Sequence, residues 1–484
     1  MILEISILTI YCLALFFIFL FSAGQLHLTW HYLKANKKEA RPGLSEYPIV
    51  TVQLPVYNEK YVVERLIDAV CQLEYPSEKL EVQVLDDSND ETHSIISEKV
   101  AEWQAKGVDI KHVTRKDRQG FKAGALQYGL EIAKGEFIAI FDADFLPNPD
   151  FLIRSMNHFD DHIGMVQCRW GHLNRNYSML TKLQAFGLDA HFTVEQVGRN
   201  HAGSFINFNG TGGVWRRSCI EDAGGWSADT LTEDLDLSYR AQLKGWKFKY
   251  LESTETPAEL PVLMAAIKSQ QYRWNKGAAE TAVKNSMKVF RSSLSLTNKL
   301  HAFFHLFNSS VFVCLLLAAV LSVPVLYITS NNPQYKLIFN LGWIFLIGFF
   351  SIALYYWIAT KRINPVDYKK KYFKLFPSFL VVSMGLSLHN GLAVIEGLLG
   401  RKTPFVRTPK FNIISKSDSW QGNTYIKPQW NVLTFFEGLL SLYFGFGIYM
   451  GLRLHDFKLL IFHFMLFLGF AIVFFYSIKS VKSE

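Results

Sequence analysis

Apolar residues follow two patterns along this chain: long unbroken runs, and short runs that alternate with polar positions. The long runs lie at residues 2–22, 306–328, 337–359, 376–399, 432–452 and 457–478. A run of this length can cross the hydrocarbon core of a bilayer as a helix. Residues 34–299 have the composition of an ordinary soluble domain. The pattern therefore predicts a membrane protein with a globular insert of roughly 250 residues.

Within the insert, short apolar runs alternate with segments of helical periodicity. Strands are expected at residues 49–54, 80–85, 110–113 and 137–141, and helices at 61–73, 92–106 and 120–133. The first strand is expected to end at Pro55. This alternation predicts a parallel α/β sheet covered by helices. A dinucleotide-binding Rossmann fold is disfavoured, because the turn after the first strand, Pro-Val-Tyr-Asn-Glu, lacks the glycine fingerprint.

The first apolar run predicts a signal anchor, because it lacks a basic start and is longer than the apolar core of a typical cleaved signal peptide. Lys34, Lys37, Lys38 and Arg41 follow it, so the positive-inside rule places the insert in the cytoplasm. The five cysteines show no paired or metal-type spacing, which fits a reducing compartment. The expected location is the cell or inner membrane, or the Golgi membrane in a eukaryote.

The formal net charge of +8 does not indicate a nucleic-acid partner. The basic residues cluster beside the membrane segments, at residues 361–362, 369–371 and 401–410. Solvated flanks that face lipid headgroups explain these clusters. The lipid bilayer is therefore the expected partner of this basic surface.

Carboxylates recur where strands are expected to end or helices to begin. They form Asp86-Asp87, Asp142-Ala143-Asp144 and Thr232-Glu233-Asp234, and Gln270-Gln271-Tyr272-Arg273-Trp274 follows them. Ligands of open α/β sheets bind beyond the carboxyl ends of the strands. Three spaced carboxylate sites with a Gln-x-x-Arg-Trp ending suit a nucleotide-sugar donor and a growing acceptor. Each signal is weak by itself, but their order and spacing together are specific.

Asp142 and Asp144 follow an apolar strand and offer hard oxygen ligands for Mg²⁺ or Mn²⁺. Such a cation offsets the charge that builds up on a departing diphosphate. A solvated turn is the ordinary alternative for Asp-x-Asp. Asp234 is the candidate general base for direct inversion at the anomeric carbon. Thr232 is also placed to cap a helix that starts at Glu233, and the two interpretations are compatible.

Cationic and aromatic side chains complete the expected site. Lys122 is placed to reach a phosphate, Arg273 suits a two-bonded contact with the diphosphate, and Trp274 offers a ring face to a sugar. Each has a plain structural alternative, so the assignment depends on the whole set. Three histidines lack a usable ligand spacing and are interpreted as structural: His172, His191 and His201.

These motifs resemble the processive branch of glycosyltransferase family 2, and within it the cellulose-synthase-like A and C group of mannan, glucomannan and glucan synthases. The resemblance is dense over residues 47–291 and returns at 400–411. The matching segments are Val84-Leu-Asp-Asp-Ser, Lys122-Ala-Gly-Ala-Leu, Phe141-Asp-Ala-Asp-Phe, His191-Phe-Thr-Val-Glu-Gln, Phe208-Asn-Gly-Thr, Gly224-Gly-Trp, Thr232-Glu-Asp-Leu-Asp-Leu and Gln270 to Trp274. It implies a GT-A-type α/β fold with a mixed, mainly parallel sheet, inserted between transmembrane helices.

The resemblance also implies roles for individual residues. Asp144 would bind the metal, and Asp234 would be the catalytic base. Donor contacts would come from Tyr57, Glu59, Asp86, Asp87, Lys122, Asp142, Gln270 and Arg273. Acceptor contacts would come from Phe208, Asn209, Gly210, Thr211, Glu233 and Trp274.

Residues 405–410, Phe-Val-Arg-Thr-Pro-Lys, resemble the gating loop of cellulose synthases, which inserts over the bound donor. Phe405, Thr408 and Lys410 keep that spacing, whereas Arg407 stands where those enzymes have an aliphatic residue. A basic loop beside the membrane is the alternative.

A loop that reaches the active site constrains the apolar run before it. Residues 376–399 would then lie between two cytoplasmic segments and would not cross the membrane once. We expect a bent, re-entrant or interfacial pair of helices with its break near Ser387, His389 and Asn390. Polar backbone at that depth must be buried in protein or line a cavity.

The chain is expected to divide into six parts. These are an N-terminal transmembrane helix (1–30), a cytoplasmic catalytic domain (45–255), interfacial helices (256–300), transmembrane or re-entrant helices (301–399), a gating-like loop (400–430) and two C-terminal transmembrane helices (431–484). The leading hypothesis is an inverting β-glycosyltransferase that elongates a polysaccharide from UDP-glucose or GDP-mannose and translocates it. One alternative is a single-addition lipid glycosyltransferase. Another is a non-catalytic transporter or scaffold, and the intact carboxylates disfavour this second alternative.

Overall fold

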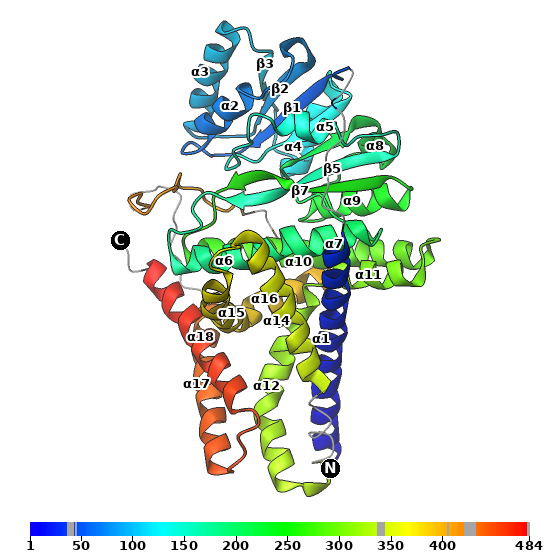
Figure 1. The fold of residues 1–484 in the computed structure, drawn as a ribbon. Helices are drawn as coiled ribbons and strands as arrows, with labels where there is room; N and C mark the ends of the chain where they lie inside the picture. The colour runs from blue at the N-terminus through cyan, green and yellow to red at the C-terminus, as the bar shows by residue number, and fades with distance from the viewer. Residues whose placement is uncertain (36–42, 44–45, 336–343, 404–405, 421–431, 482–484) are drawn as a thin grey trace.

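A mixed β-sheet forms the centre of the insert (Figure 1). The computed structural model describes residues 1–35, 43, 46–335, 344–403, 406–420 and 432–481. In that part of the chain the sheet has seven strands in the order β3-β2-β1-β4-β6-β5-β7. They are β1 (Val50–Val56), β2 (Leu80–Asp86), β3 (Ile110–Thr114), β4 (Phe137–Ile140), β5 (Ile163–His172), β6 (Gly213–Arg216) and β7 (Lys247–Ala258). Only β6 runs antiparallel to its described neighbours, which confirms the predicted mixed, mainly parallel sheet.

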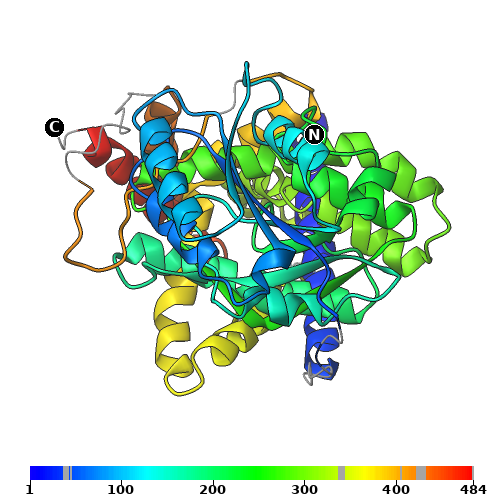
Figure 2. The same ribbon diagram turned by 90° about the horizontal axis from the view of Figure 1, so that it is seen from above.

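The strands carry apolar residues on both faces of the sheet, so helices cover both faces. Val52 and Leu54 of β1 pack against α2 and α3, and Ile138 of β4 packs with α4 on the other side. The view from above shows α2 and α3, in blue, side by side along the sheet (Figure 2). The helices of this domain are α2 (Val63–Cys71), α3 (Thr92–Ala105), α4 (Phe121–Ile132), α5 (Phe151–Met156), α6 (Met179–Ala190), α7 (Gln196–His201), α8 (Arg217–Asp222) and α9 (Glu233–Leu243), with short η1 (Ser77–Lys79) and η2 (His191–Glu195).

The expected strands and helices of the first half of the insert are all present, with their ends shifted by at most two residues. β1 does not end at Pro55 but continues to Val56. Its ladder with β4 stops at Gln53, so at Pro55 the strand is paired only with β2. A residue without an N–H is tolerated where one side of the strand has no neighbour to receive that donor.

Apolar helices form a bundle at the other end of the molecule (Figure 1). Four described helices are long and apolar enough to cross a membrane: α1 (Ile2–Lys34), α12 (Ser310–Asn331), α17 (Val432–Arg453) and α18 (Leu460–Val481). The bundle also contains α14 (Ile344–Ile363), and η3 (Pro333–Tyr335) follows α12. Two further helices, α10 (Met264–Arg291) and α11 (Leu296–Leu306), lie between the sheet and the bundle.

The apolar run that was expected to bend does so. α15 (Tyr368–Gly385) and α16 (Ser387–Leu398) meet at Leu386 and are bent by 53°. Polar side chains just after the break contact α10: His389 Nε2 lies 2.9 Å from the carbonyl oxygen of Lys268, and Asn390 donates to Gln271. The break therefore joins the bundle to the helix that carries the Gln-x-x-Arg-Trp motif.

Two glycines allow α15 and α18 to touch through their backbones. A Cβ on Gly385 would lie 2.2 Å from the carbonyl oxygen of Gly469, and one on Gly469 would lie 2.2 Å from that of Val381. Small residues at such a crossing are typical of helices that pack within a membrane.

Candidate active site

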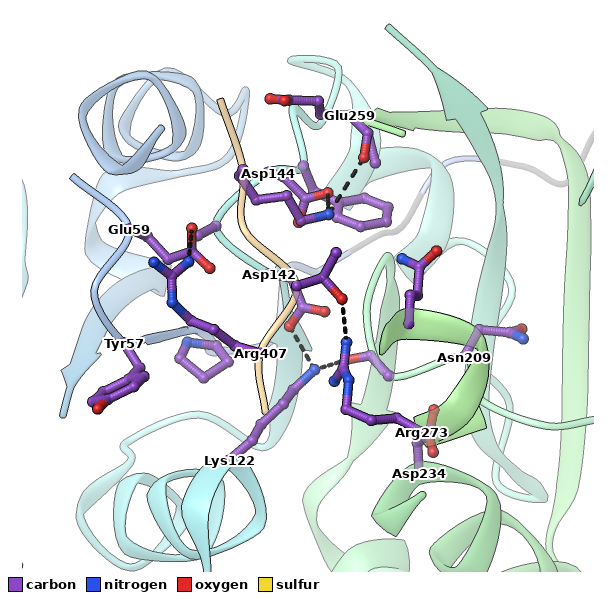
Figure 3. A pocket seen from close by; sticks show the side chains of 18 of the residues that line it. Tyr57, Glu59, Lys122, Asp142, Asp144, Asn209, Asp234, Glu259, Arg273 and Arg407 are labelled. Atoms are coloured by element: carbon purple, nitrogen blue, oxygen red, sulfur yellow. Dashed lines mark hydrogen bonds and ion pairs between the residues drawn. The ribbon is translucent and has the colours of Figure 1, made fainter. Parts of the chain in front are cut away.

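A pocket opens where strands β1 and β4 end and where α10 and the loop of residues 406–410 approach them (Figure 3). The structure brings most of the expected site residues into its lining, from segments far apart in the sequence. These are Tyr57, Glu59, Asp87, Lys122, Asp142, Asp144, Asn209, Gly210, Glu233, Asp234, Gln270, Arg273, Trp274, Thr408 and Lys410.

Three expected site residues lie behind this lining. Phe208 is fully buried in the core against Trp215, and the buried hydroxyl of Thr211 accepts a hydrogen bond from the backbone N–H of Asp142. Asp86 is also buried and contacts histidines of α3 and β3. The expected direct contacts of these residues with donor or acceptor are therefore not supported by their positions. Phe405 lies outside the described residues.

Lys122 occupies the first turn of α4 and faces Asp142. Its Nζ lies 2.5 Å from Asp142 Oδ1 and donates to the carbonyl oxygen of Gly210 at 2.9 Å. Burial lowers the pKa of Lys122, but Asp142 and Glu233 outweigh it and raise the pKa above its ordinary value. Lys122 therefore stays charged, as a phosphate-binding lysine must.

Asp234 lies beside Lys122 and Gly210 at the start of α9. Gly210 has φ +81°, and a Cβ there would lie 3.1 Å from Asp234 Oδ2, so a larger residue would crowd this carboxylate. Burial and the neighbouring Glu233 raise the pKa of Asp234 to about 7. A carboxylate with such a pKa is suited to accept a proton near neutral pH.

The start of α9 is held differently from a side-chain cap. Thr232 is the N-cap residue, as expected, but its hydroxyl makes no capping bond. It lies 3.1 Å from the hydroxyl of Thr281 on α10 instead. A Cβ on Gly277 of α10 would lie 2.6 Å from the Thr232 side chain. Close packing against α10 therefore positions Glu233 and Asp234.

Asp144 is paired with a cation from the distant loop. Lys410 Nζ lies 2.6 Å from Asp144 Oδ2 and 3.3 Å from the carbonyl oxygen of Glu259. The ammonium group marks a position, bounded by oxygen atoms, where a positive charge is favourable. A divalent cation fits this oxygen-rich corner, because Mg²⁺ and Mn²⁺ prefer such ligands and complete their shell with phosphate and water.

Two further residues of the 406–410 loop make contacts in the pocket. Arg407 lies 3.0 Å from Glu59, and Arg273 donates to the hydroxyl of Thr408 at 2.8 Å. Burial raises the pKa of Glu59 to about 8, against the opposing effect of Arg407. The Arg118 guanidinium lies 3.3 Å from the centre of the Tyr57 ring. Loop residues and donor-site residues thus contact each other directly.

Sequence reasoning did not identify four ionisable members of the lining as site residues: Arg118, His172, Glu259 and Arg407. Arg118 could have been found from the basic loop before α4. Arg407 could have been found from its departure from the aliphatic residue of the cellulose synthase gating loop. His172, interpreted as structural, lies next to Asp189 and faces the pocket wall. His191 pairs with Glu195 and His201 with His31, outside the lining.

The charges of the lining suit a nucleoside diphosphate. Cationic groups come from Arg118, Lys122, Arg273, Arg407 and Lys410, and carboxylates from Glu59, Asp87, Asp142, Asp144, Glu233, Asp234 and Glu259. The cations match phosphate oxygens, whereas the carboxylates offer a metal ligand, a proton acceptor and partners for sugar hydroxyls. This combination suits transfer of a group from a diphosphate to a hydroxyl.

Comparisons with known proteins agree with this chemistry. Residues 48–277 match the family described as "Glycosyltransferase like family 2". Glucomannan 4-beta-mannosyltransferase 1 of Oryza sativa subsp. japonica is 36% identical over 398 residues, which cover 78% of this chain and 72% of that protein. Glucomannan 4-beta-mannosyltransferase 2 of Arabidopsis thaliana is 35% identical over 418 residues, covering 84% and 76%.

A solved structure shows the same fold. The mannosyltransferase PcManGT from Pyrobaculum calidifontis, in complex with GDP-Man and Mn²⁺, superposes with a TM-score of 0.56. The alignment covers 82% of this chain and 100% of that one, at 21% sequence identity.

Proposed function

The chain belongs to glycosyltransferase family 2 and is a β-hexosyltransferase that uses a nucleotide sugar, and from this premise we propose that its donor is GDP-mannose. The product is a β-linked, mannose-containing polysaccharide, elongated at the pocket and released through the helical bundle. The names of the relatives support the choice of mannose, since the matched plant proteins are mannosyltransferases. The ligands of the PcManGT complex, GDP-Man and Mn²⁺, support the choice of guanine as the nucleobase of the donor and of Mn²⁺ as the cation.

One observation carries the proposed sugar transfer at this pocket: Asp234, Lys122 and Asp142 share one corner of it. Lys122 Nζ reaches Asp142, and the space beside Gly210 is bordered by both Lys122 Nζ and Asp234 Oδ2. A diphosphate held by Lys122 would therefore present its sugar to Asp234. This proximity supports a reacting centre at which a base and a leaving-group contact act together.

The residues of the pocket divide the work of a single inverting displacement. Asp234 accepts the proton of the acceptor hydroxyl as its oxygen bonds to the anomeric carbon and the bond to the diphosphate breaks. Lys122 and Arg273 stabilise the charge on the leaving diphosphate. Asp144 is the residue that would hold Mn²⁺ or Mg²⁺, which supplies further positive charge to the phosphates. Trp274 offers a ring face to the acceptor sugar beside Asn209 and Glu233.

Transfer of a single sugar to a lipid is the second candidate function. The loop of residues 406–410 favours the polymer, because Arg407, Thr408 and Lys410 contact Glu59, Arg273 and Asp144 inside the pocket. A loop of this kind can open and close around each donor during repeated additions. The bundle of apolar helices supports a membrane-embedded enzyme. The basic residues that follow the first apolar run support a catalytic domain in the cytoplasm.

Radiolabelled transfer in proteoliposomes tests the proposal. GDP-mannose and UDP-glucose are supplied separately with Mn²⁺ or Mg²⁺, and the product is sized and digested with β-mannanase or β-1,4-glucanase. We expect a high-mass product from GDP-mannose that β-mannanase degrades and that the Asp234→Asn variant does not form. Label confined to organic-extractable lipid would establish the second candidate instead, and label from UDP-glucose alone would overturn the choice of donor.

A further inference from the structure

Asp86, His93 and His112 form a cluster outside the lining of the pocket. Asp86 is the last residue of β2, His93 lies in the first turn of α3, and His112 lies in β3, the edge strand of the sheet. Asp86 Oδ2 lies 2.8 Å from His93 Nδ1 and 2.8 Å from His112 Nε2. The three potential ligand atoms all lie within 4.8 Å of one another.

Asp86 and His112 are each oriented by a second hydrogen bond. The backbone N–H of Ser88 donates to Asp86 Oδ1 at 2.8 Å, which turns Oδ2 toward the histidines. The hydroxyl of Ser97 lies 3.0 Å from His112 Nδ1, which directs Nε2 toward Asp86. Metal-binding histidines and carboxylates are typically held in this way by groups that contact their other polar atom.

The carboxylate of Asp86 gives the cluster its negative charge. Three basic side chains of the surrounding segments are paired with other carboxylates: Lys60 with Glu91, Lys111 with Glu81 and Arg115 with Asp87. Burial raises the pKa of Asp86, but hydrogen bonds from His112, Ser88 and His93 outweigh burial and lower the pKa below its ordinary value. The carboxylate is therefore ionised, as a metal ligand must be.

An ion has a route to this cluster from solvent. The His93 side chain is 54% exposed and that of His112 is 15% exposed, whereas Asp86 is covered. Ser97, Lys111 and His112 also line an open groove beside α3. The covered Asp86 is held by its hydrogen bonds, whereas the exposed His93 can move to admit an ion.

We propose that the Asp86–His93–His112 cluster binds a divalent transition-metal ion, and that Zn²⁺ is the ion its ligands suit. Two imidazole nitrogens and one carboxylate oxygen are ligands that Zn²⁺ accepts, with water in a fourth position. Mg²⁺ prefers oxygen ligands, so this site differs from the oxygen-rich corner at Asp144. The proposal does not depend on the function proposed above.

Binding requires a small rearrangement of the ligand atoms. Ligand atoms about 2.0–2.1 Å from Zn²⁺ in a tetrahedron lie roughly 3.3 Å apart, so His93 Nδ1 and His112 Nε2 must each separate from Asp86 Oδ2 by about half an ångström from their 2.8 Å contacts. The proton of His93 moves from Nδ1 to the solvent-facing Nε2. The proton of His112 moves from Nε2 to Nδ1, and Nδ1–H can then donate a hydrogen bond to the Ser97 hydroxyl oxygen. The ion then joins the edge strand β3 and α3 to β2.

Metal titration of the purified full-length protein in detergent tests the proposal. Excess Mg²⁺ is present throughout to saturate the oxygen site. Co²⁺ is added as a spectroscopic substitute, and the affinity for Zn²⁺ is measured by competition with a chromophoric chelator. We expect one tight site, with ligand-field absorption of Co²⁺ bound to nitrogen and oxygen. Substitutions His93→Gln and His112→Gln should each weaken Zn²⁺ binding by at least ~100-fold, and Ser97→Ala by about tenfold.

His162→Gln is the matched control, because His162 is exposed on a loop of the same domain. Gln at position 93 keeps a hydrogen-bond donor on an exposed side chain, so the fold should persist, and the thermal unfolding of each metal-free variant verifies this. The same Zn²⁺ affinity in His93→Gln as in His162→Gln would overturn the proposal. Loss of the ion in His31→Gln but not in His93→Gln would also overturn it, because it would assign the ion to the histidines beside α1.

Discussion

Lys410 Nζ lies 2.6 Å from Asp144 Oδ2, although 266 positions separate these residues along the chain. Both side chains are buried, so each neutralises the other inside the pocket. The pair places the end of the 406–410 loop at the oxygen atoms that would hold the cation. Loop position and cation binding are therefore expected to be coupled.

Removal of the Lys410 charge should strengthen cation binding. In Lys410→Met, Asp144 loses its competing ammonium group, and we expect the affinity for Mn²⁺ without donor to rise by about tenfold, equivalent to ~1.4 kcal/mol. Electron paramagnetic resonance of free Mn²⁺ measures this. Lys416→Met, an exposed lysine on the same segment, is the control. An unchanged affinity in Lys410→Met would show that the pair does not compete with the cation.

Removal of the candidate base should abolish turnover while preserving donor binding. Asp234→Asn keeps the shape of the side chain but cannot accept a proton, so the rate of transfer should fall by about 10²–10⁴-fold. Binding of GDP, measured by calorimetry, should persist. Asp161→Asn, at an exposed carboxylate, should behave as wild type. A variant at position 234 that retains full turnover would exclude Asp234 as the base.

The pH dependence of kcat/KM should report the same group. The base acts in its ionised form, and the pKa of Asp234 is raised to about 7, so activity should increase as pH rises through 7. Below that pH, kcat/KM should fall by about tenfold per unit, and above about pH 8 it should level off. Initial rates at low donor concentration between pH 5.5 and 9 measure this. A profile that decreases between pH 6 and 8 would contradict the assignment.

The ion pair between Lys268 and Glu437 should stabilise the contact between α10 and the bundle. Lys268 Nζ lies 2.7 and 2.8 Å from the two carboxylate oxygens of Glu437 and 2.9 Å from the Ser477 hydroxyl, and the Glu437 side chain is fully buried. Glu437→Met or Lys268→Met alone should destabilise the protein by about 3–5 kcal/mol, because each leaves a buried charge without its partner.

Thermal unfolding in detergent measures this effect. The double variant Lys268→Met with Glu437→Met removes both charges and should be more stable than either single variant. Equal losses that simply add in the double variant would show that the two groups do not act as a pair.

The contact between α15 and α18 should not tolerate a larger residue. Gly469→Ala places a methyl group 2.2 Å from the carbonyl oxygen of Val381, so the helices must separate, at a cost of about 1–3 kcal/mol. Gly445→Ala on α17 is the control, because its methyl group would meet Phe467 at an ordinary 3.5 Å. Melting temperatures in detergent distinguish them, and equal stability of the two variants would contradict the close packing.

The sequence by itself determined the local features of this protein. The strands and helices in the first half of the insert follow from the period of the apolar residues, and polar residues inside an apolar run indicated where that run breaks, next to Leu386. The motifs around Asp142, Asp234 and Arg273 identified the family, because their spacing is a property of the chain alone. Such features depend on neighbours in the sequence, so they are visible without coordinates.

Only the tertiary structure decided which side chains meet. Asp86 and Asp87 are adjacent, but one is buried beneath His93 and His112 while the other lines the pocket, because successive residues at the end of a strand face opposite sides. The contacts of Lys410 with Asp144 and of Arg407 with Glu59 join segments hundreds of residues apart. Their pairing depends on how helices, loop and sheet pack together, which no periodicity in the sequence records.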